Sequence, residues 1–265
     1  MFQRHGWSVE ALVGSQDTAD RLGDRPFPVL ACDITSRASL ESLAVAPSPD
    51  VLIHCASSRG GGESAYAALY RDGLANLIAA LNPTKPIFTS STSVYGQVDG
   101  SWVDEGSPAE PDRTTSRVLR EAEALCLDNN GTVLRLAGIY GPGRAVLVRK
   151  LRAGEAVLEE GGGRWVNQIH RDDAASALFH AANGFVPSGI FNVADDEPAS
   201  QRDIYVWLSE RTGLPMPPDG PRNANRKRGN TDKRVSNQKL HATGWIPAFP
   251  SFREGYATVL TADSA

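Results

Sequence analysis

Hydroxyl side chains gather where one apolar segment ends, and they are the first candidates for chemistry in this chain. The segment Pro86–Ser91 is typical of a strand, and it finishes with Ser90 and Ser91. Open α/β sheets place their ligands at the carboxyl ends of strands. The Ser91 hydroxyl could therefore donate a hydrogen bond to a substrate oxygen. The alternative is a serine that caps or shapes a turn.

Four further polar residues stand at predicted strand ends or helix starts. Asp33 follows a short apolar run, where a carboxylate either faces a ligand or caps the next helix. His170 could shuttle a proton near neutral pH, or it could be a structural histidine. Asp172 and Asp173 begin a predicted helix, so helix capping is the alternative to a functional role for one of them.

Short apolar segments alternate with helical patterns along the chain. Asp50–Ala56 is a continuous apolar run, which suits a strand buried on both faces of a parallel sheet. Further strands are predicted over 8–13, 28–32, 86–91, 132–136 and 189–194, and helices over 64–81, 116–127 and 201–212. Gly213 is expected to cap the last of these helices. The alternation predicts a Rossmann-like, doubly wound α/β fold with a parallel sheet.

Composition excludes several classes of protein. The 265 residues are 41% hydrophobic and 22% charged, which is ordinary for a globular protein. A net charge of −4 argues against a nucleic-acid binder, and no apolar run is long enough to span a membrane. The three cysteines form no CxxC or Cys/His cluster, so we expect no metal site and a reducing, cytoplasmic compartment. The N-terminus lacks the apolar region of a signal peptide.

Domain organisation changes after the first half of the chain. We expect residues 1–145 to form a dinucleotide-binding part and residues 146–265 to form mainly a smaller substrate lobe. Within the lobe, residues 165–195 are expected to return to the sheet. A basic stretch in the lobe reads either as a solvated loop or as a clamp for an anionic substrate. Its members are Arg222, Arg226, Lys227, Arg228, Lys233 and Arg234.

Four strings of residues stand in a fixed order along the chain. They are Asp50–Ser57, Thr89–Gly96 with its Val-Tyr-Gly ending, Leu134–Gly143 with its Tyr-Gly-Pro-Gly turn, and Ile169–Ala175 with its His-Arg-Asp-Asp start. Together they resemble the extended short-chain dehydrogenase/reductase superfamily, in its NAD-dependent epimerase/dehydratase branch. The resemblance spans about Gly6 to Gly255.

The resemblance implies a site, a cofactor and partners. It implies NAD or NADP as cofactor, and a sugar-nucleotide-like or similar polar metabolite as substrate. It also implies a homodimer formed through helices 64–81 and 116–127, and an asparagine, Asn76, that ties strand ends. The implied cofactor-binding residues are Asp33, Ala56, Ser57, Ser90, Gly138 and Ile139, and the implied substrate-binding residues are Ser91, Arg144, Asn167 and His170. No arginine directly follows the second family strand, at Gly14–Asp17, which favours NAD over NADP.

The start of the chain departs from the family. The family opens with a strand and a glycine-rich turn that brings the backbone to the cofactor pyrophosphate. Here Arg4–Val9 already matches the end of the helix that follows this turn. A missing central strand would leave two unpaired edges, and each buried unpaired backbone group costs about 1–3 kcal/mol. We therefore expect either a truncated start, which we favour, or a sheet that closes by rearrangement. Cofactor binding by the chain as given is in doubt for the same reason.

The catalytic pair also departs from the family. The family uses Tyr-x-x-x-Lys, but Thr115 and Leu119 occupy those two positions, and neither can move a proton. Arg117 or Arg120 could supply charge, although an arginine is a poor proton donor. Tyr95 and Tyr140 are the candidate substitute acids. Their alternative role is as packed aromatic residues.

Two hypotheses of different kinds follow. The first is an NAD(P)-dependent epimerase, dehydratase or reductase in which Ser91 polarises the substrate. The second is a non-catalytic relative that binds a dinucleotide or metabolite as a sensor or interaction module. The missing Tyr/Lys pair favours the second hypothesis, and the intact family strings favour the first. A third, weaker hypothesis is a degraded fragment without a function of its own.

Overall fold

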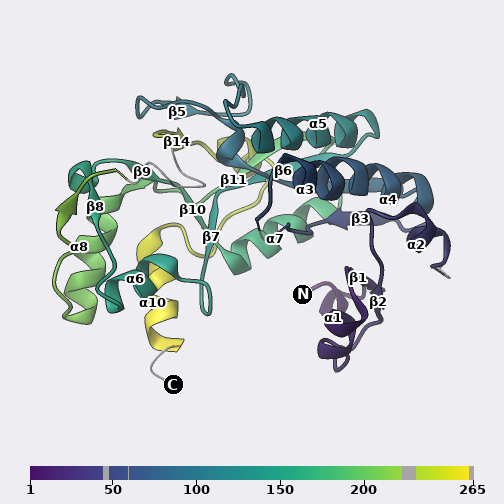
Figure 1. Ribbon diagram of the computed structural model, residues 1–265, viewed down its shortest axis with the longest axis horizontal. Coiled ribbons are helices and arrows are strands. Elements are labelled where there is room, and N and C mark those ends of the chain that lie inside the picture. Colours follow the sequence, from purple (N-terminus) through teal and green to yellow (C-terminus); the bar gives the residue numbers. More distant parts are fainter. Residues whose placement is uncertain (44–47, 59, 223–230, 263–265) are drawn as a thin grey trace. The chain divides into compact units, whose positions relative to one another are not determined.

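The computed structural model describes residues 1–43, 48–58, 60–222 and 231–262, and it alternates strands and helices as the sequence predicts (Figure 1). The strands are β1 (Ala11–Val13), β2 (Val29–Ala31), β3 (Val51–His54), β4 (Lys85–Ser91), β5 (Trp102–Val103), β6 (Thr132–Leu136), β7 (Gly138–Tyr140), β8 (Leu158–Glu159), β9 (Trp165–Val166), β10 (Gln168–His170), β11 (Gly189–Val193), β12 (Ala199–Ser200), β13 (Asp219–Gly220) and β14 (Arg234–Val235). The α-helices are α1 (Gln16–Arg21), α2 (Arg37–Glu41), α3 (Glu63–Tyr66), α4 (Gly73–Leu81), α5 (Thr114–Asp128), α6 (Val146–Arg152), α7 (Arg171–Ala182), α8 (Gln201–Thr212), α9 (Gln238–His241) and α10 (Phe252–Ala262). A π-helix, η2 (Ala67–Asp72), joins α3 to α4, and short 3₁₀ turns cover Gln3–His5, Thr92–Val94 and Glu160–Gly162.

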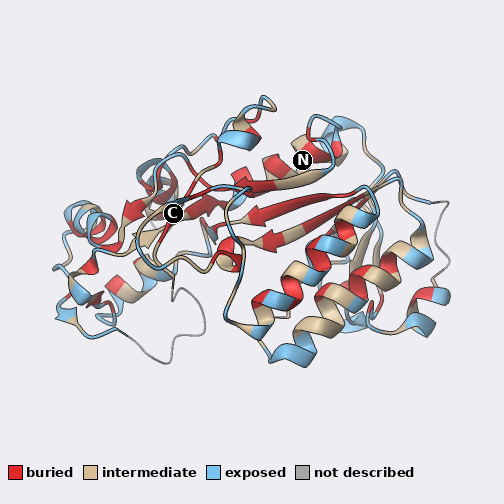
Figure 2. Cartoon of the chain, turned by 90° about the horizontal axis from the view of Figure 1, so that it is seen from above, coloured by how far each residue is buried: buried red, intermediate tan, exposed pale blue. Residues whose placement is uncertain are grey.

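One sheet carries strands in the order β11-β6-β4-β3. Its strands β3 and β4 pair in parallel, with Val51 opposite Lys85 and His54 opposite Phe88. Figure 2 shows these strands buried, while the helices beside them are striped, buried on one side and exposed on the other. The predicted α/β fold with a parallel sheet is confirmed. None of the helices described has the length and apolar composition needed to cross a membrane.

Compact units divide the chain differently from the predicted boundary. Unit 1 comprises residues 1–90, 112–133 and 178–189, and unit 2 comprises residues 91–111, 134–177 and 190–265. The sequence analysis expected one main change at residue 145 with a return over 165–195. In the structure each unit instead takes three segments, because the chain passes from one unit to the other within β4, β6, α7 and β11 and again between Pro111 and Asp112.

Helices of unit 1 pack on β3 and β4. The predicted helix over 64–81 is present as the continuous run of α3, η2 and α4, whose Leu74 and Leu77 are buried. Asn82 ends this run in the left-handed conformation. The run packs against α5 (Figure 1). At the start of β4 the Lys85 ammonium donates to the carbonyl oxygens of Ala181 and Val186, which fixes the end of α7 beside this strand.

The first strands stand apart from the larger sheet. Strands β1 and β2 form a two-stranded parallel sheet of their own, with Leu12 opposite Leu30. Within the described ranges no backbone ladder joins β1 to β3. The rearrangement that would close the sheet is therefore not what the structure shows.

The core of unit 2 lies in what the sequence analysis expected to be the substrate lobe. Strand β7 and helices α6, α8 and α10 supply most of its apolar side chains. Twelve buried residues form the cluster: Tyr140, Val148, Leu151, Ala156, Leu158, Ala199, Ile204, Tyr205, Leu208, Phe252, Tyr256 and Val259. Gly213 ends α8 in the left-handed conformation, as predicted.

Gly131 is the position in unit 1 where a side chain is least tolerated. A Cβ atom there would lie 2.5 Å from the Cys126 Sγ and 2.7 Å from the carbonyl oxygens of Cys126 and Pro86. Backbone atoms cannot move aside cheaply, so we expect Gly131→Ala to destabilise the fold by about 1–3 kcal/mol. This corresponds to roughly 2–12 °C in a thermal unfolding curve.

The matched control is Gly14→Ala, because a Cβ atom at Gly14 meets no atom within 4 Å. Its midpoint should stay within about 1 °C of the native value, in keeping with the small effect of most surface substitutions. Equal unfolding midpoints for the two variants would contradict the close packing described around Gly131.

Candidate functional site

Ser91 ends β4 and begins the 3₁₀ turn Thr92–Val94. Its Oγ accepts a hydrogen bond of 3.2 Å from the Ser93 backbone N–H. This bond makes Ser91 a capping residue, which was the alternative role in the sequence analysis. The same bond fixes the oxygen in place and leaves the hydroxyl hydrogen available for donation to a ligand. The half-buried side chain can therefore combine both roles.

Tyr95 is fully buried and its hydroxyl is engaged on both sides. The hydroxyl donates to Asn192 Oδ1 at 2.9 Å and accepts from Arg135 Nη1 at 2.8 Å. The Arg135 guanidinium also lies 4.9 Å from the centre of the Tyr95 ring. Burial raises the pKa of Tyr95. These contacts favour the packed aromatic role over the acid role.

Asn192 extends this network to two other segments of unit 2. Its backbone N–H donates to Glu105 Oε1 at 2.6 Å, and its side-chain amide donates to the Ser236 carbonyl at 3.1 Å. Burial raises the pKa of Glu105. The network therefore connects the segment that follows Ser91 to β11 and to the segment after β14.

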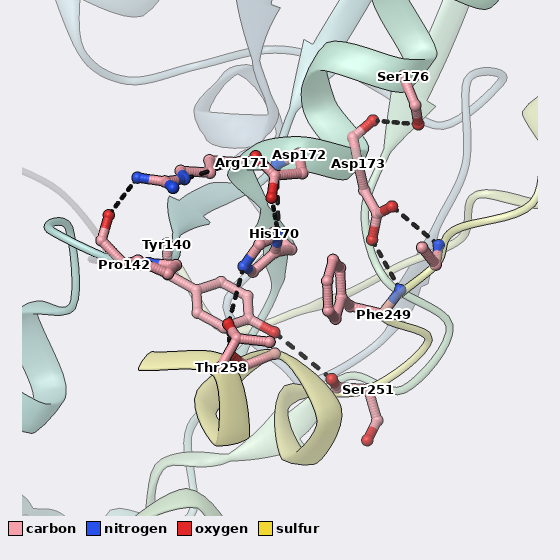
Figure 3. A network of polar contacts seen from close by, with 12 residues as sticks. Tyr140, Pro142, His170, Arg171, Asp172, Asp173, Ser176, Phe249, Ser251 and Thr258 are labelled. Atoms are coloured by element: carbon pink, nitrogen blue, oxygen red, sulfur yellow. Dashed lines mark hydrogen bonds and ion pairs between the residues drawn. The ribbon is translucent and has the colours of Figure 1, made fainter. Parts of the chain in front are cut away.

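His170 and Tyr140 form a second buried cluster (Figure 3). The His170 ring lies 3.9 Å from the Phe249 ring and 5.6 Å from the Tyr140 ring, measured between ring centres. Its Nε2 is 3.3 Å from Thr258 Oγ1. Burial lowers the pKa of His170 and raises the pKa of Tyr140, whose hydroxyl donates to the Ser251 carbonyl at 3.4 Å. The packing favours the structural role for His170 and the packed aromatic role for Tyr140 over a role in proton transfer.

Asp173 binds a distant loop, not the start of its own helix. Its two carboxylate oxygens accept from the backbone N–H groups of Ala248 and Phe249 at 2.8 and 2.9 Å (Figure 3). Burial raises the pKa of Asp173, and these two bonds oppose that rise. Asp172 is exposed beside Arg171. Asp173 alone of the two thus holds the loop whose Phe249 packs on the His170 ring.

Ser90 belongs to an internal chain of contacts in unit 1. Its hydroxyl donates to Glu123 Oε1 at 2.6 Å, and Arg120 Nη1 lies 2.5 Å from Glu123 Oε2. Glu123 is fully buried, so its charge is balanced by Arg120. Leu119 is buried on the same helix, and Thr115 is half-buried. Arg120, the candidate cofactor cation, is therefore committed to a structural ion pair.

Residues expected to contact the cofactor lie just after strands β2 and β3 of unit 1. Asp33 is exposed after β2, and its Oδ1 accepts from the Thr35 backbone N–H and hydroxyl at 3.0 and 2.7 Å. Ser36, not Asp33, caps α2. Ala56 and Ser57 are exposed after β3. The Asn76 amide donates to the Ile34 carbonyl at 3.0 Å, which ties α4 to the end of β2.

The pyrophosphate of a dinucleotide finds no comparable site in the parts of the chain that the structure describes. Gly60, Gly61 and Gly62 precede α3, but Glu63 in the first turn would repel an anion there. The described residues therefore provide no site for the pyrophosphate of NAD(P).

The remaining predicted residues lie together in unit 2 at β7 and β10. The Gly138 N–H donates to the Asn167 carbonyl, and the Arg144 Nε donates to the Ile139 carbonyl. Both ends of the Asn167 amide bind the backbone of β14 and the residue before it, at Lys233 and Val235. Asn167 is thus occupied by structural contacts, whereas Arg144 is exposed.

A cavity of about 290 Å³ in unit 2 was not predicted. It is lined by Val98, Glu159, Glu160, Gly163, Arg164, Arg222 and Asp232. Arg222 belongs to the basic stretch that the sequence analysis identified, whose Arg226, Lys227 and Arg228 lie outside the described residues. Arg164 was missed, although its position just after a triple glycine and before a predicted family string was a usable signal. Two arginines and three carboxylates therefore line the cavity, which gives it mixed charge and not the purely basic lining expected of a clamp for an anion.

The buried network around Tyr95 yields a measurable difference between two tyrosines. Tyr95→Phe removes an acceptor from Arg135 and a donor from Asn192, so we expect a loss of about 1–3 kcal/mol in the free energy of unfolding. Tyr140→Phe removes a single long hydrogen bond and should lose less than Tyr95→Phe. Thermal and urea unfolding of both variants measures the difference. A Tyr95→Phe protein as stable as Tyr140→Phe would contradict the network.

The cluster around His170 predicts a pH dependence of stability. The pKa of His170 is lowered in the fold, so the unfolded chain takes up a proton first as the pH falls. Stability should therefore fall below about pH 6.5, with a slope of at most about 1.4 kcal/mol per pH unit from this group. His170→Asn should flatten that slope, while the similarly lowered pKa of His54 leaves part of it. An unchanged slope in unfolding curves from pH 7.5 to about 5 would contradict the assignment.

Comparisons with known proteins agree with this fold. Residues 2–194 match the NAD dependent epimerase/dehydratase family. The chain is 30% identical over 225 residues to Protein YeeZ of Escherichia coli strain K12, covering 80% of this chain and 78% of that protein. It is 29% identical to a Methylobacillus flagellatus structure classed with the NAD-dependent epimerase/dehydratases, with a TM-score of 0.77 over 97% of this chain and 99% of that one. The UDP-glucose 4-epimerase of Thermotoga maritima shares the fold at 18% identity, with a TM-score of 0.82 over 99% of this chain and 93% of that one. The chain therefore belongs to the NAD dependent epimerase/dehydratase family.

Proposed function

We propose that the chain is an NAD(P)-dependent epimerase, dehydratase or reductase that acts on a sugar nucleotide or a similar polar metabolite. Family membership supports the reaction class. The observation that carries the proposal is Ser91, whose oxygen is fixed by the Ser93 N–H at the carboxyl end of β4 while its hydrogen stays available. The Thermotoga maritima relative was solved with UDP-glucose, which supports the substrate class.

Substrate handling is assigned to residues of unit 2. Ser91 donates to an oxygen of the substrate and so polarises the carbon that carries it. The cavity lined by Arg164, Arg222 and three carboxylates receives a polar part of the substrate, because these donors and acceptors can bind hydroxyl groups. Neither buried tyrosine is assigned a proton-transfer step.

Cofactor binding is assigned to unit 1. Asp33, Ala56 and Ser57 would hold the adenosine end of NAD or NADP, and NAD is favoured because no arginine follows β1 directly. When bound, the nicotinamide supplies a hydride acceptor and donor. We assign no step through it, because the described residues do not provide a pyrophosphate site.

The second candidate function is a non-catalytic binding protein of the same fold. It is favoured by the two buried tyrosines, whose hydroxyls are engaged, and by Leu119 at the position of the family lysine. Such a protein would bind nucleotide and cofactor without turnover. We also propose a homodimer through the run α3–α4 and helix α5, and a reducing cytoplasmic compartment for its three free thiols.

A calorimetric titration with NAD⁺ and with NADP⁺ tests the cofactor assignment. We expect binding that is tighter for NAD⁺ than for NADP⁺, and weaker than a site with pyrophosphate contacts would give. A folded chain that binds neither cofactor would contradict NAD(P) dependence. Incubation with cofactor and UDP-sugars, followed by absorbance of the reduced nicotinamide and by product analysis, then separates the enzyme from the binding protein.

Ser91→Ala is the variant that tests the mechanism. It should lower kcat/KM by about 100-fold, as the loss of one hydrogen bond to the reacting oxygen does elsewhere, and leave cofactor affinity unchanged. Ser93→Ala is the matched control, because Ser93 contributes its backbone N–H and this group remains. Equal activities for the two variants would remove Ser91 from the mechanism.

A further inference from the structure

One turn of unit 2 has a left-handed backbone. It covers Glu160, Gly161 and Gly162, whose φ angles are 50°, 77° and 73°. A residue with a side chain is strained in this conformation, because its Cβ atom lies too close to the following carbonyl oxygen. Glycine is therefore the residue expected at all three positions, and Glu160 is the exception.

Other left-handed residues have an ordinary explanation. Apart from glycines, the described ranges hold two of them, Asn82 and Asn130. Asn82 is the C-cap of α4, and Asn130 follows the end of α5. Asparagine tolerates this conformation better than most residues and often ends a helix in it. Glu160 is neither an asparagine nor the end of an α-helix, so its conformation must be imposed by its surroundings.

The start of α8 imposes that conformation. On one side of Glu160, the Glu159 N–H donates to Gln201 Oε1 at 3.1 Å. On the other side, Arg202 Nε donates to the Gly161 carbonyl at 2.6 Å. A strained residue persists only where its neighbours fix it in this way, and such residues gather at functional sites.

The strained turn also forms part of the wall of the cavity in unit 2. Glu159, Glu160 and Gly163 are among the residues that line this cavity of about 290 Å³. The left-handed backbone therefore occurs at a place where a ligand can be received. This coincidence directs attention to the Glu160 side chain.

Among the described residues that line the cavity, Glu160 alone has a charged group without a partner. Arg164, Arg222 and Glu159 each interact with other groups. Asp232 accepts a backbone N–H through its Oδ1. No described residue forms a hydrogen bond or an ion pair with the exposed Glu160 carboxylate. The group in this cavity that is ready to bind a ligand is therefore an anion.

The chemistry of a free carboxylate restricts the ligand. An ionised carboxylate only accepts hydrogen bonds, and its two oxygens can accept from the hydroxyl groups of a ligand. A carboxylate on the ligand would offer no donor and would meet a like charge, which is a common way for a site to reject a competitor.

We propose that Glu160 determines the charge specificity of the cavity. Its carboxylate accepts hydrogen bonds from the hydroxyl groups of a neutral sugar and excludes a sugar that carries a carboxylate. This inference rests on the proposed function and adds to it a residue that discriminates between neutral and acidic substrates. The strain of the turn is retained because glycine at this position would remove the discriminating group.

Calorimetric titration of the full chain tests this inference without cofactor or turnover. The probes are UDP-glucose and UDP-glucuronate, which differ by one carboxylate in place of a hydroxymethyl group. We expect the native chain to bind UDP-glucose more tightly. Glu160→Gln should raise the affinity for UDP-glucuronate by about 5-fold, because a like charge is removed. It should lower the affinity for UDP-glucose by about 2- to 10-fold, because a neutral acceptor replaces a charged one.

Glu160→Gly separates specificity from folding. It removes the carboxylate and the strain together, so the preference for UDP-glucose should be lost. The midpoint of thermal unfolding should stay at or above the native value, because relief of the strain offsets the entropy that glycine adds to the unfolded chain. A lower midpoint with an unchanged preference would assign Glu160 to the fold alone.

Glu210→Gln is the matched control. Glu210 is also an exposed carboxylate of unit 2, on α8, and it does not line the cavity. Its replacement removes the same charge and should leave both affinities unchanged. A native chain that binds UDP-glucuronate as tightly as UDP-glucose, or a Glu160→Gln variant with the native preference, would overturn the specificity role alone. A folded native chain that binds neither UDP-sugar would overturn the proposed substrate class together with this inference.

Discussion

The buried charge of Arg135 constrains most of what unit 2 can do. An arginine on a central strand with 1% of its surface exposed is stable only if its guanidinium meets polar groups in good geometry. The Tyr95 hydroxyl and ring meet that requirement, and Asn192 and Glu105 extend it to other segments. Leaving such a buried group without its partner typically destabilises a protein by about 1–3 kcal/mol. The segment after Ser91 is therefore fixed by a requirement of the core, and the position of Ser91 follows from it.

Polar side chains that look alike in the sequence fall into two classes in the structure, according to whether the fold already uses their hydrogen-bonding groups. Tyr95, Ser90 and Asn167 have their hydrogen-bonding groups committed to other parts of the protein. Ser91 and Arg144 retain groups that can reach a ligand. A group already satisfied in the fold gives up a hydrogen bond when it turns to a substrate, so the second class is better suited to binding and chemistry.

Secondary structure could be predicted well because it depends on local patterns. The apolar run before His54 and the helical spacing of Leu74 and Leu77 each show in a few adjacent residues, and β3 and α4 follow them closely. The partners of the tyrosines could not be predicted, because Asn192 is 97 residues from Tyr95 and only the tertiary fold brings them together. Asp33 shows the limit of local rules, since Ser36 three residues later takes the capping role. The two cavity arginines show both outcomes. Arg222 was recognised in the sequence as part of a basic stretch, whereas Arg164 was not recognised.

The contacts proposed for the cofactor and those proposed for the substrate come from separate units of the chain, so the two can be studied independently. The groups proposed for the adenosine of the cofactor come from unit 1, after β2 and β3. The cavity and Ser91 both belong to unit 2. Loss of pyrophosphate binding in unit 1 would remove hydride chemistry but would leave every contact proposed for the nucleotide substrate intact. The recognition of substrate proposed for unit 2 therefore does not depend on the cofactor contacts proposed for unit 1, and an active enzyme and a binding protein of this family would share it.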